Sequence, residues 1–420
     1  MTELFLLGAG SSIEAGVPGA YKMTNEMLAR VAEDDIAQHK RIDKILQFVA
    51  AGLIFQQGIK GENPFNGVNI EDLFNAVKSL SDRQKSVLVP FISAWHPQLV
   101  ALESGKMAGF TSRDILETIN EPIEEHISEA MQELKKQIEQ DIERLLNGKH
   151  ISSHHNRNKE IKTFRASSRF ESHLTDAIRQ VVIGGDGELF QSAAEVMILK
   201  LVEMVWITDL DKVNYLVPLV QYAKETKSTI ATLNYDNAIE LAGKIANVEI
   251  DTGFDRWSTS GDFIFEAEKT PLLKLHGSID WALTDGQTST NKPLPYQIIE
   301  RVNIDENRQR GLKPAVVFGG TNKLTAKGPF LSLIRSFEQH LSKTELLTII
   351  GYSFRDEHVN EFITNWFNGN SARKIRVIDL YPDSLNDEYA RFLFQGYAKS
   401  RVQVIKETAS SGIMNIVQTR

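Results

Sequence analysis

The feature that most constrains the fold is the start of the chain, ELFLLGAGSSIEAGVP, in which a short apolar segment runs directly into a glycine turn. Residues 4–7 are all apolar, which is typical of a central strand of a parallel sheet that is buried on both faces. Gly8 and Gly10 allow a tight turn and the close approach of a ligand to the backbone. Ser11 or Ser12 can cap the helix that follows, and the free N–H groups at a helix N-terminus attract a diphosphate. The stretch predicts an α/β fold with a phosphate-binding turn. The alternative is that the glycines are needed only for the geometry of the turn and bind no ligand.

Several classes of protein are excluded or disfavoured by the sequence. The usual dinucleotide fingerprint has a third glycine where this chain has Ile13, so an ordinary dehydrogenase loop is not expected. The formal net charge of -8 argues against a generally basic nucleic-acid binder, and direct nucleic-acid binding is not expected. The chain contains 0 cysteines, which excludes disulfides, a cysteine nucleophile and a thiolate zinc site. No secretory signal and no segment of membrane-spanning length is found, so we expect a cytoplasmic protein.

The pattern along the 420 residues predicts one α/β core that is interrupted by a large all-helical insertion. We assign residues 1–80 and 207–395 to the core, 81–206 to the insertion, and 396–420 to a C-terminal tail. The insertion has a long apolar stripe at helical spacing over residues 123–145, which either packs within its own domain or contacts a partner. Three further helices are expected at residues 23–31, 42–55 and 68–80, the last of them capped by Asn69. The adjacent His154 and His155 fall in a polar stretch, where solvent exposure is favoured over metal binding.

Short apolar runs that end in polar or glycine residues follow the insertion, and they predict successive strands of a doubly wound, mostly parallel sheet. They are STIATLNYD, LLKLHGSIDW, AVVFGG, ELLTIIGYSF and KIRVIDLYPD. Ligand groups in such sheets gather at the carboxyl ends of the strands. Asn234 and Asp236 stand at such a strand end and could bind a ligand, or they could cap the next helix. His276 stands at another strand end and could transfer a proton, or it could be a buried histidine whose hydrogen bonds are made within the core. Gly351 and Ser353 form a second small-residue turn.

The order of these segments resembles the sirtuin family, whose core is Rossmann-like. GAGSSIEAGVP is similar to the sirtuin opening, TLNYD stands where sirtuins have Thr-Gln-Asn-Ile-Asp, LHGS carries the His-Gly pair, and IIGYSF and VIDLYP replace two later segments. The resemblance covers roughly residues 1–30 and 225–390. It implies that the diphosphate of NAD is held by Gly8, Ala9, Gly10 and Ser12, and that Asp236 contacts the nicotinamide. It implies that the adenosine half is held by Gly351, Ser353 and Asp379. It also implies that Asn234 positions water or the nicotinamide ribose and that His276 acts as the base.

The chain also departs from sirtuin deacylases in ways that change the expected reaction. Those enzymes carry a four-cysteine zinc module after the His-Gly pair, whereas this chain has 0 cysteines and only a modest stretch over residues 283–314. Gly19, Ala20 and Tyr21 stand where sirtuins have Asp-Phe-Arg. A sirtuin pocket without the acyl-lysine groove should still break the nicotinamide–ribose bond, with water as the acceptor. The pattern looks like the bacterial sirtuin-like NAD hydrolases of antiphage defence, some of which are paired with a HerA-type ATPase.

The leading hypothesis is therefore an NAD(+) glycohydrolase that releases nicotinamide and ADP-ribose and uses no metal. An NAD-dependent deacylase that has lost its zinc, and a non-catalytic sensor that binds NAD or ADP-ribose, are the alternatives. The sequence does not distinguish NAD from NADP as the substrate, or linear from cyclic ADP-ribose as the product. Because an ungated NAD hydrolase would harm its host, we also expect a homo-oligomer larger than a dimer, with a HerA-type ATPase as partner on grounds of resemblance.

Overall fold

The computed structural model describes residues 2–34, 37–61, 67–82, 188–303, 314–318, 328–382 and 396–418. The chain divides into two compact units, residues 1–77 with 193–420, and residues 78–192. Nearly all described residues belong to the first unit, and the architecture below is that of this unit. The predicted stripe at 123–145, together with His154 and His155, lies outside the described residues.

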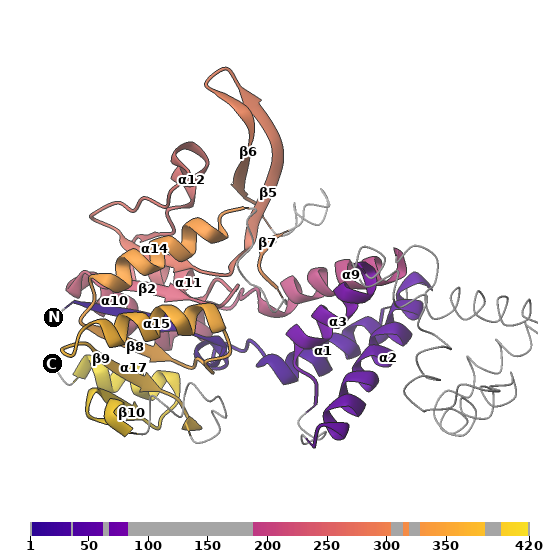
Figure 1. Ribbon diagram of the computed structural model, residues 1–420, viewed down its shortest axis with the longest axis horizontal. Helices are drawn as coiled ribbons and strands as arrows, with labels where there is room; N and C mark the ends of the chain where they lie inside the picture. Colours follow the sequence, from indigo (N-terminus) through magenta and orange to yellow (C-terminus); the bar gives the residue numbers. More distant parts are fainter. Residues whose placement is uncertain are drawn as a thin grey trace, which may run out of the picture. The chain divides into compact units, whose positions relative to one another are not determined.

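A seven-stranded parallel sheet forms the centre of the first unit (Figure 1). Its strands lie in the order β10-β9-β8-β1-β2-β4-β3. In chain order they are β1 (Glu3–Leu7), β2 (Thr229–Thr232), β3 (Ile250–Asp251), β4 (Thr270–Lys274), β8 (Leu346–Ile350), β9 (Lys374–Ile378) and β10 (Val402–Ile405). Because β2 lies on one side of β1 and β8 on the other, the sheet reverses its winding at β1. A reversal of this kind opens a crevice at the carboxyl end of the central strand.

Helices accompany the sheet, and the predicted α/β class is confirmed. They are α1 (Ala20–Ala32), α2 (Ala37–Ile59), α3 (Ile70–Asp82), α9 (Glu188–Val205), α10 (Val217–Thr226), α11 (Ala238–Ala246), α12 (Phe254–Ser260), α14 (Phe330–Ser342), α15 (Glu357–Gly369) and α17 (Ala409–Gln418). Helix α10 contacts both α11 and α17, and α14 contacts α15. Within the described ranges, no helix is both long and apolar enough to cross a bilayer.

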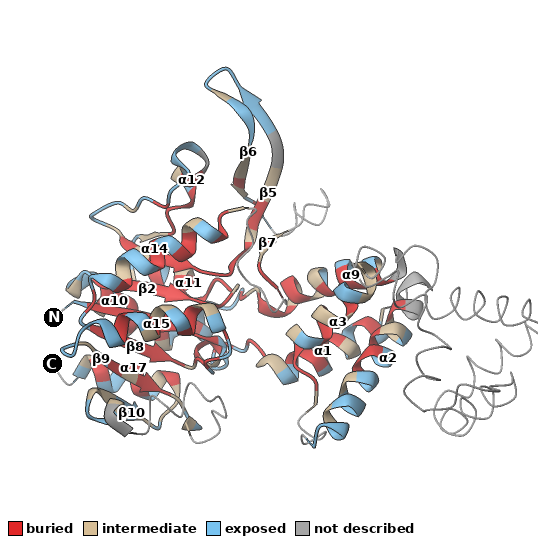
Figure 2. Cartoon of the chain, viewed as in Figure 1, coloured by how far each residue is buried: buried red, intermediate tan, exposed pale blue. Residues whose placement is uncertain are grey.

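Alternate residues of β1 face different helices, as the side-chain period of a strand requires. Leu4 and Leu6 belong to a buried cluster that includes side chains of α14 and α15. The ring of Phe5 instead meets Tyr222 of α10 edge-on, with 5.9 Å between the ring centroids. All of β1 is buried, in agreement with the predicted central strand (Figure 2).

The predicted helices near the N-terminus are present as α1, α2 and α3. The expected cap of α3 is confirmed, because the side chain of Asn69 accepts a hydrogen bond from the backbone N–H of Glu71 at 2.9 Å. Beyond position 395, where the sequence placed the end of the core, β10 pairs with β9 and extends the sheet.

The stretch after the His-Gly pair forms a separate antiparallel sheet that the sequence did not predict. Strands β5 (Gly277–Ser289) and β6 (Lys292–Arg301) make a long hairpin, and β7 (Pro314–Val316) pairs with the base of β5 (Figure 1). The interpretation of AVVFGG as a strand of the main sheet is therefore wrong. An apolar run of this length carries no information about which sheet it joins.

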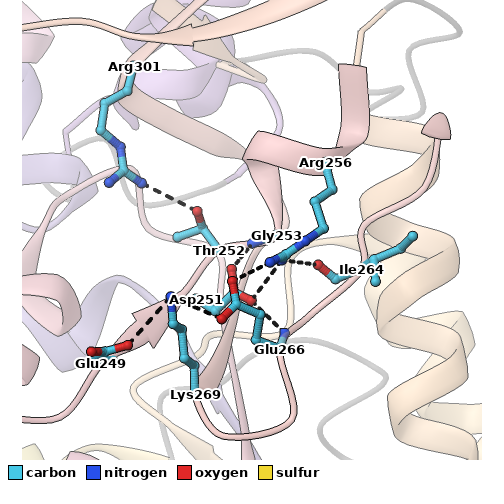
Figure 3. Close-up of polar contacts among 9 residues, drawn as sticks. All are labelled: Glu249, Asp251, Thr252, Gly253, Arg256, Ile264, Glu266, Lys269 and Arg301. Carbon is cyan, nitrogen blue, oxygen red and sulfur yellow. Dashed lines mark hydrogen bonds and ion pairs between the residues drawn. The ribbon is translucent and has the colours of Figure 1, made fainter. Parts of the chain in front are cut away.

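A polar network holds the connection between β3 and β4 (Figure 3). Asp251 at the end of β3 accepts hydrogen bonds from the backbone of Glu266 at 2.7 Å and from Arg256 at 3.3 Å. Arg256 also pairs with Glu266, and Lys269 bridges Glu249 at 3.5 Å and Glu266 at 3.2 Å. The network orders the segment that leads into β4, the strand whose end carries His276.

Candidate functional site

The register of the central strands places the predicted site segments at the same edge of the sheet. Leu7 at the end of β1 pairs with Thr232 of β2 and with Ile350 of β8. Thr232 in turn pairs with Lys274 of β4, so Asn234 and His276 both lie two residues beyond the last paired position. The carboxyl ends of β1, β2, β4 and β8 therefore meet at the crevice beside β1.

A cavity of about 160 Å³ lies at this edge. Its wall includes seven of the predicted site residues, namely Gly8, Ala9, Ser12, Asn234, Asp236, His276 and Ser353. Three others, Gly10, Gly351 and Asp379, are not in its lining. Val17, Asn69, Tyr235 and Phe318 also line it, so the site combines apolar walls with a few polar groups, as small-molecule sites commonly do.

The opening glycine turn packs against the loop after β8. A Cβ atom added to Gly8 would lie 2.5 Å from the Cα of Tyr352, and one added to Gly10 would lie 2.8 Å from the Cα of Gly351. The backbone N–H of Gly10 donates to the carbonyl of Gly351 at 2.8 Å. The glycines Gly8 and Gly10 therefore allow the opening turn and the loop after β8 to pack closely against each other.

The expected serine cap is wrong. Residues Ala9–Ser12 form a single 3-10 turn without a side-chain cap, and α1 begins only at Ala20. The hydroxyl of Ser11 instead donates to the carbonyl of Gly8 at 2.7 Å. The seven residues from Ile13 to Gly19 separate this turn from α1, so no α-helix begins directly at the glycine turn.

Asn234 is buried and ties β2 to the opening turn. Its Nδ2 donates to the carbonyl of Gly8 at 3.0 Å, to Oγ of Ser12 at 2.9 Å and to Oγ of Ser11 at 3.3 Å. A carbonyl oxygen can only accept, which fixes the amide with its nitrogen toward Gly8. The Oδ1 atom has no hydrogen-bond partner among the described residues and is available to accept one from a bound molecule.

Asp236 has both a structural contact and a place in the cavity wall. Its carboxylate accepts from the backbone N–H of Ala238, the first residue of α11, at 3.0 Å, although the N-cap residue of that helix is Asn237. Burial raises the pKa of the Asp236 carboxyl, and the ammonium of Lys274 opposes that rise. The fully buried Lys274 donates to the carbonyl of Asp236 at 2.6 Å and to Glu240 at 2.8 Å.

His276 pairs with a carboxylate that sequence reasoning missed. Its Nε2 lies 2.8 Å from Oδ2 of Asp356, and both side chains are buried. Asp356 also caps α15 through Oδ1, which accepts from the backbone N–H groups of His358 at 3.1 Å and Val359 at 3.2 Å. The only signal in the sequence was an acid shortly after the IIGYSF turn, 80 residues beyond His276.

Arg355 is the one arginine or lysine in the described lining of the cavity, and it too was missed. Its guanidinium lies over the ring of Tyr21 at 5.4 Å from the ring centroid and donates to the Tyr21 hydroxyl at 2.9 Å. Tyr21 stands where sirtuins have the arginine of Asp-Phe-Arg. The positive charge at this wall of the cavity is that of Arg355, which lies in the loop after β8.

Neither Gly351 nor Asp379 lines the cavity. Gly351 has φ +62°, and a Cβ there would lie 2.4 Å from the backbone nitrogen of Ser11. Asp379 follows β9, and its carboxylate accepts from the backbone N–H of Tyr381 at 2.7 Å. Within the described residues, no group of three or more metal-ligating side chains is found.

The comparison with protein families gives one clear result. Residues 228–399 match the SIR2-like domain. The match contains β2, β4, β8 and β9 and thus Asn234, His276 and Asp356, whereas the opening strand and glycine turn lie before it. A comparison with curated proteins gave no match.

Solved sirtuin structures are similar to the chain at low sequence identity. Sir2Tm bound to a propionylated peptide is 12% identical, with a TM-score of 0.33 and coverage of 55% of this chain and 81% of that one. A Sir2–p53 peptide–NAD+ complex is 12% identical, with a TM-score of 0.34 and coverage of 55% and 80%.

Proposed function

We propose that the chain is an NAD(+) glycohydrolase that cleaves the nicotinamide–ribose bond. The observation that carries the proposal is the convergence of Asn234, His276 and the opening glycine turn on one cavity at the edge of a SIR2-like sheet. The absence of cysteine supports water as the acceptor, because a four-cysteine zinc module cannot form.

The arrangement suits a displacement at the ribose carbon that bears nicotinamide. The bond between that carbon and the ring nitrogen breaks, and nicotinamide departs as a neutral molecule with the bonding electrons. Water supplies the oxygen of the new bond, and its proton passes to His276 as general base. Oδ1 of Asn234 accepts from the attacking water or from a ribose hydroxyl, while its Nδ2 stays bound to the opening turn.

Arg355 gives a test of how the proposed substrate is held. Replacing it by alanine should raise KM for NAD by about tenfold, because the diphosphate would lose its cation at the wall, while kcat changes little. Lys22→Ala is the control, since its side chain is mostly exposed and pairs with Glu26 outside the cavity lining. An unchanged KM in Arg355→Ala would contradict this role.

Two other functions use the same site and are separated by product analysis. A deacylase would require an acetyl-lysine peptide and would form an acetylated ADP-ribose. A sensor would bind NAD and return it intact after long incubation. Nicotinamide and ADP-ribose that appear without peptide, in equal amounts, are the result that the proposal expects.

We also propose that the chain works in antiphage defence as a homo-oligomer larger than a dimer, gated by a HerA-type ATPase. This part rests on the resemblance of the motifs alone. Light scattering of the purified chain should give a mass well above twice 47.2 kDa, and NAD cleavage should depend on the ATPase. A monomer that is fully active without a partner would contradict it.

A further inference from the structure

The contact between His276 and Asp356 joins two segments that are far apart in the sequence. Nε2 of His276 and Oδ2 of Asp356 are 2.8 Å apart, and both side chains are buried. We propose that Asp356 is a positioning residue that holds His276 in the tautomer with its proton on Nε2, leaving Nδ1 as the basic nitrogen. The inference rests on the proposed function, in which His276 is the base.

The hydrogen bonds of Asp356 determine which partner donates. Oδ1 already accepts from two backbone N–H groups at the start of α15, a place where a helix favours negative charge. A carboxylate can only accept, so Nε2 of His276 must be the donor in this pair. In a neutral imidazole the other nitrogen then carries the lone pair. Nδ1 has no hydrogen-bond partner among the described residues, and His276 lines the cavity.

The loop that carries Asp356 is held in a fixed conformation. Phe354 is fully buried with φ +58°, a conformation that is strained for an aromatic residue. Nδ2 of Asn360 donates to the carbonyl of Phe354 at 2.6 Å, and the hydroxyl of Tyr352 donates to Asn360 at 2.9 Å. The same hydroxyl accepts from the backbone N–H of Asp356 at 3.1 Å. Strain that persists because its surroundings enforce it is typical of functional loops.

The alternative is that Asp356 only caps α15. Asp356→Asn separates the two roles, because the amide oxygen can keep the cap while Nδ2 faces His276. A donor at that position requires an acceptor on Nε2 and so forces the proton to Nδ1. Asp209→Asn is the matched control, since Asp209 caps a 3-10 turn by accepting from Asp211 at 3.0 Å and does not line the cavity.

The experiment reads the tautomer directly by ¹⁵N NMR of the full-length chain labelled at histidine. The chain has 10 histidines, and the signal that disappears in His276→Gln assigns His276. We expect the Nε2–H tautomer in the wild type and in Asp209→Asn, and the Nδ1–H tautomer in Asp356→Asn. Turnover by Asp356→Asn should fall by at least ~10²-fold in kcat with KM little changed.

The outcomes separate the inference from the proposed function. A wild type with its proton on Nδ1 overturns the inference whatever its activity. An Asp356→Asn variant that keeps wild-type kcat also overturns it. If the wild type shows the Nε2–H tautomer but cleaves no NAD, the proposed function fails while the geometric assignment of Asp356 stands.

Discussion

Replacement of Asn234 by alanine is expected to lower NAD cleavage by about 10²–10³-fold, because the group that positions the reacting water or ribose is lost. The structure adds a cost in stability that the sequence did not indicate. Nδ2 of Asn234 has three acceptors on the opening turn, and the buried carbonyl of Gly8 would lose this donor. The carbonyl of Gly8 keeps two donors from Ser11, its hydroxyl at 2.7 Å and its backbone N–H at 2.9 Å, so we expect the cost of an ordinary hydrogen bond, about 0.5–1.5 kcal/mol of unfolding free energy.

Asn237→Ala provides the matched control for this prediction. Asn237 lies in the same strand-end segment, is also buried, and makes two hydrogen bonds with the backbone of Ile207, at 2.9 Å and 3.0 Å. Its loss should lower stability to a similar degree while turnover per folded molecule is unchanged. Comparable activity losses in both variants, measured by product formation and thermal unfolding, would mean that Asn234 acts only through the fold.

Gly351→Ala is expected to destabilise the fold and to abolish cleavage together. The residue has φ +62°, which costs about 1–2 kcal/mol for a residue with a side chain. The new Cβ would lie 2.4 Å from the backbone nitrogen of Ser11, so the opening turn must also move. Forced overpacking adds about 1–3 kcal/mol.

Gly52→Ala should change stability in the opposite direction. Gly52 lies inside α2, and a Cβ there would meet nothing within 4 Å. Alanine is favoured over glycine in a helix interior by about 0.5–1 kcal/mol. Chemical denaturation of both variants tests the pair, and a Gly351→Ala protein as stable and as active as the wild type would refute the packing of the two loops.

Features that depend on local sequence could be predicted. The apolar run before Gly8 identified the buried central strand, and Asn69 followed by Glu71 identified the cap of α3, because both signals lie within a few residues. Asn234 and His276 could be placed near each other because parallel strands end at the same edge of the sheet.

Features that depend on tertiary packing could not be predicted. The partner of His276 is 80 residues away, and nothing in the spacing of Asp356 distinguishes it from an ordinary helix cap. The role of Gly8 and Gly10 in packing against the loop of Gly351 is equally non-local. The antiparallel hairpin of β5 and β6 was not predicted, because its mostly polar sequence fits either a strand or a loop.

The most direct test of the central claim is NAD turnover by the wild-type chain beside His276→Ala, with the proposed ATPase present and with nicotinamide and ADP-ribose both quantified. The account predicts equal amounts of the two products from the wild type and a loss of about 10²–10⁴-fold in the variant, the range of general base catalysis. Equal activity of the two proteins, or no nicotinamide from either, would contradict it.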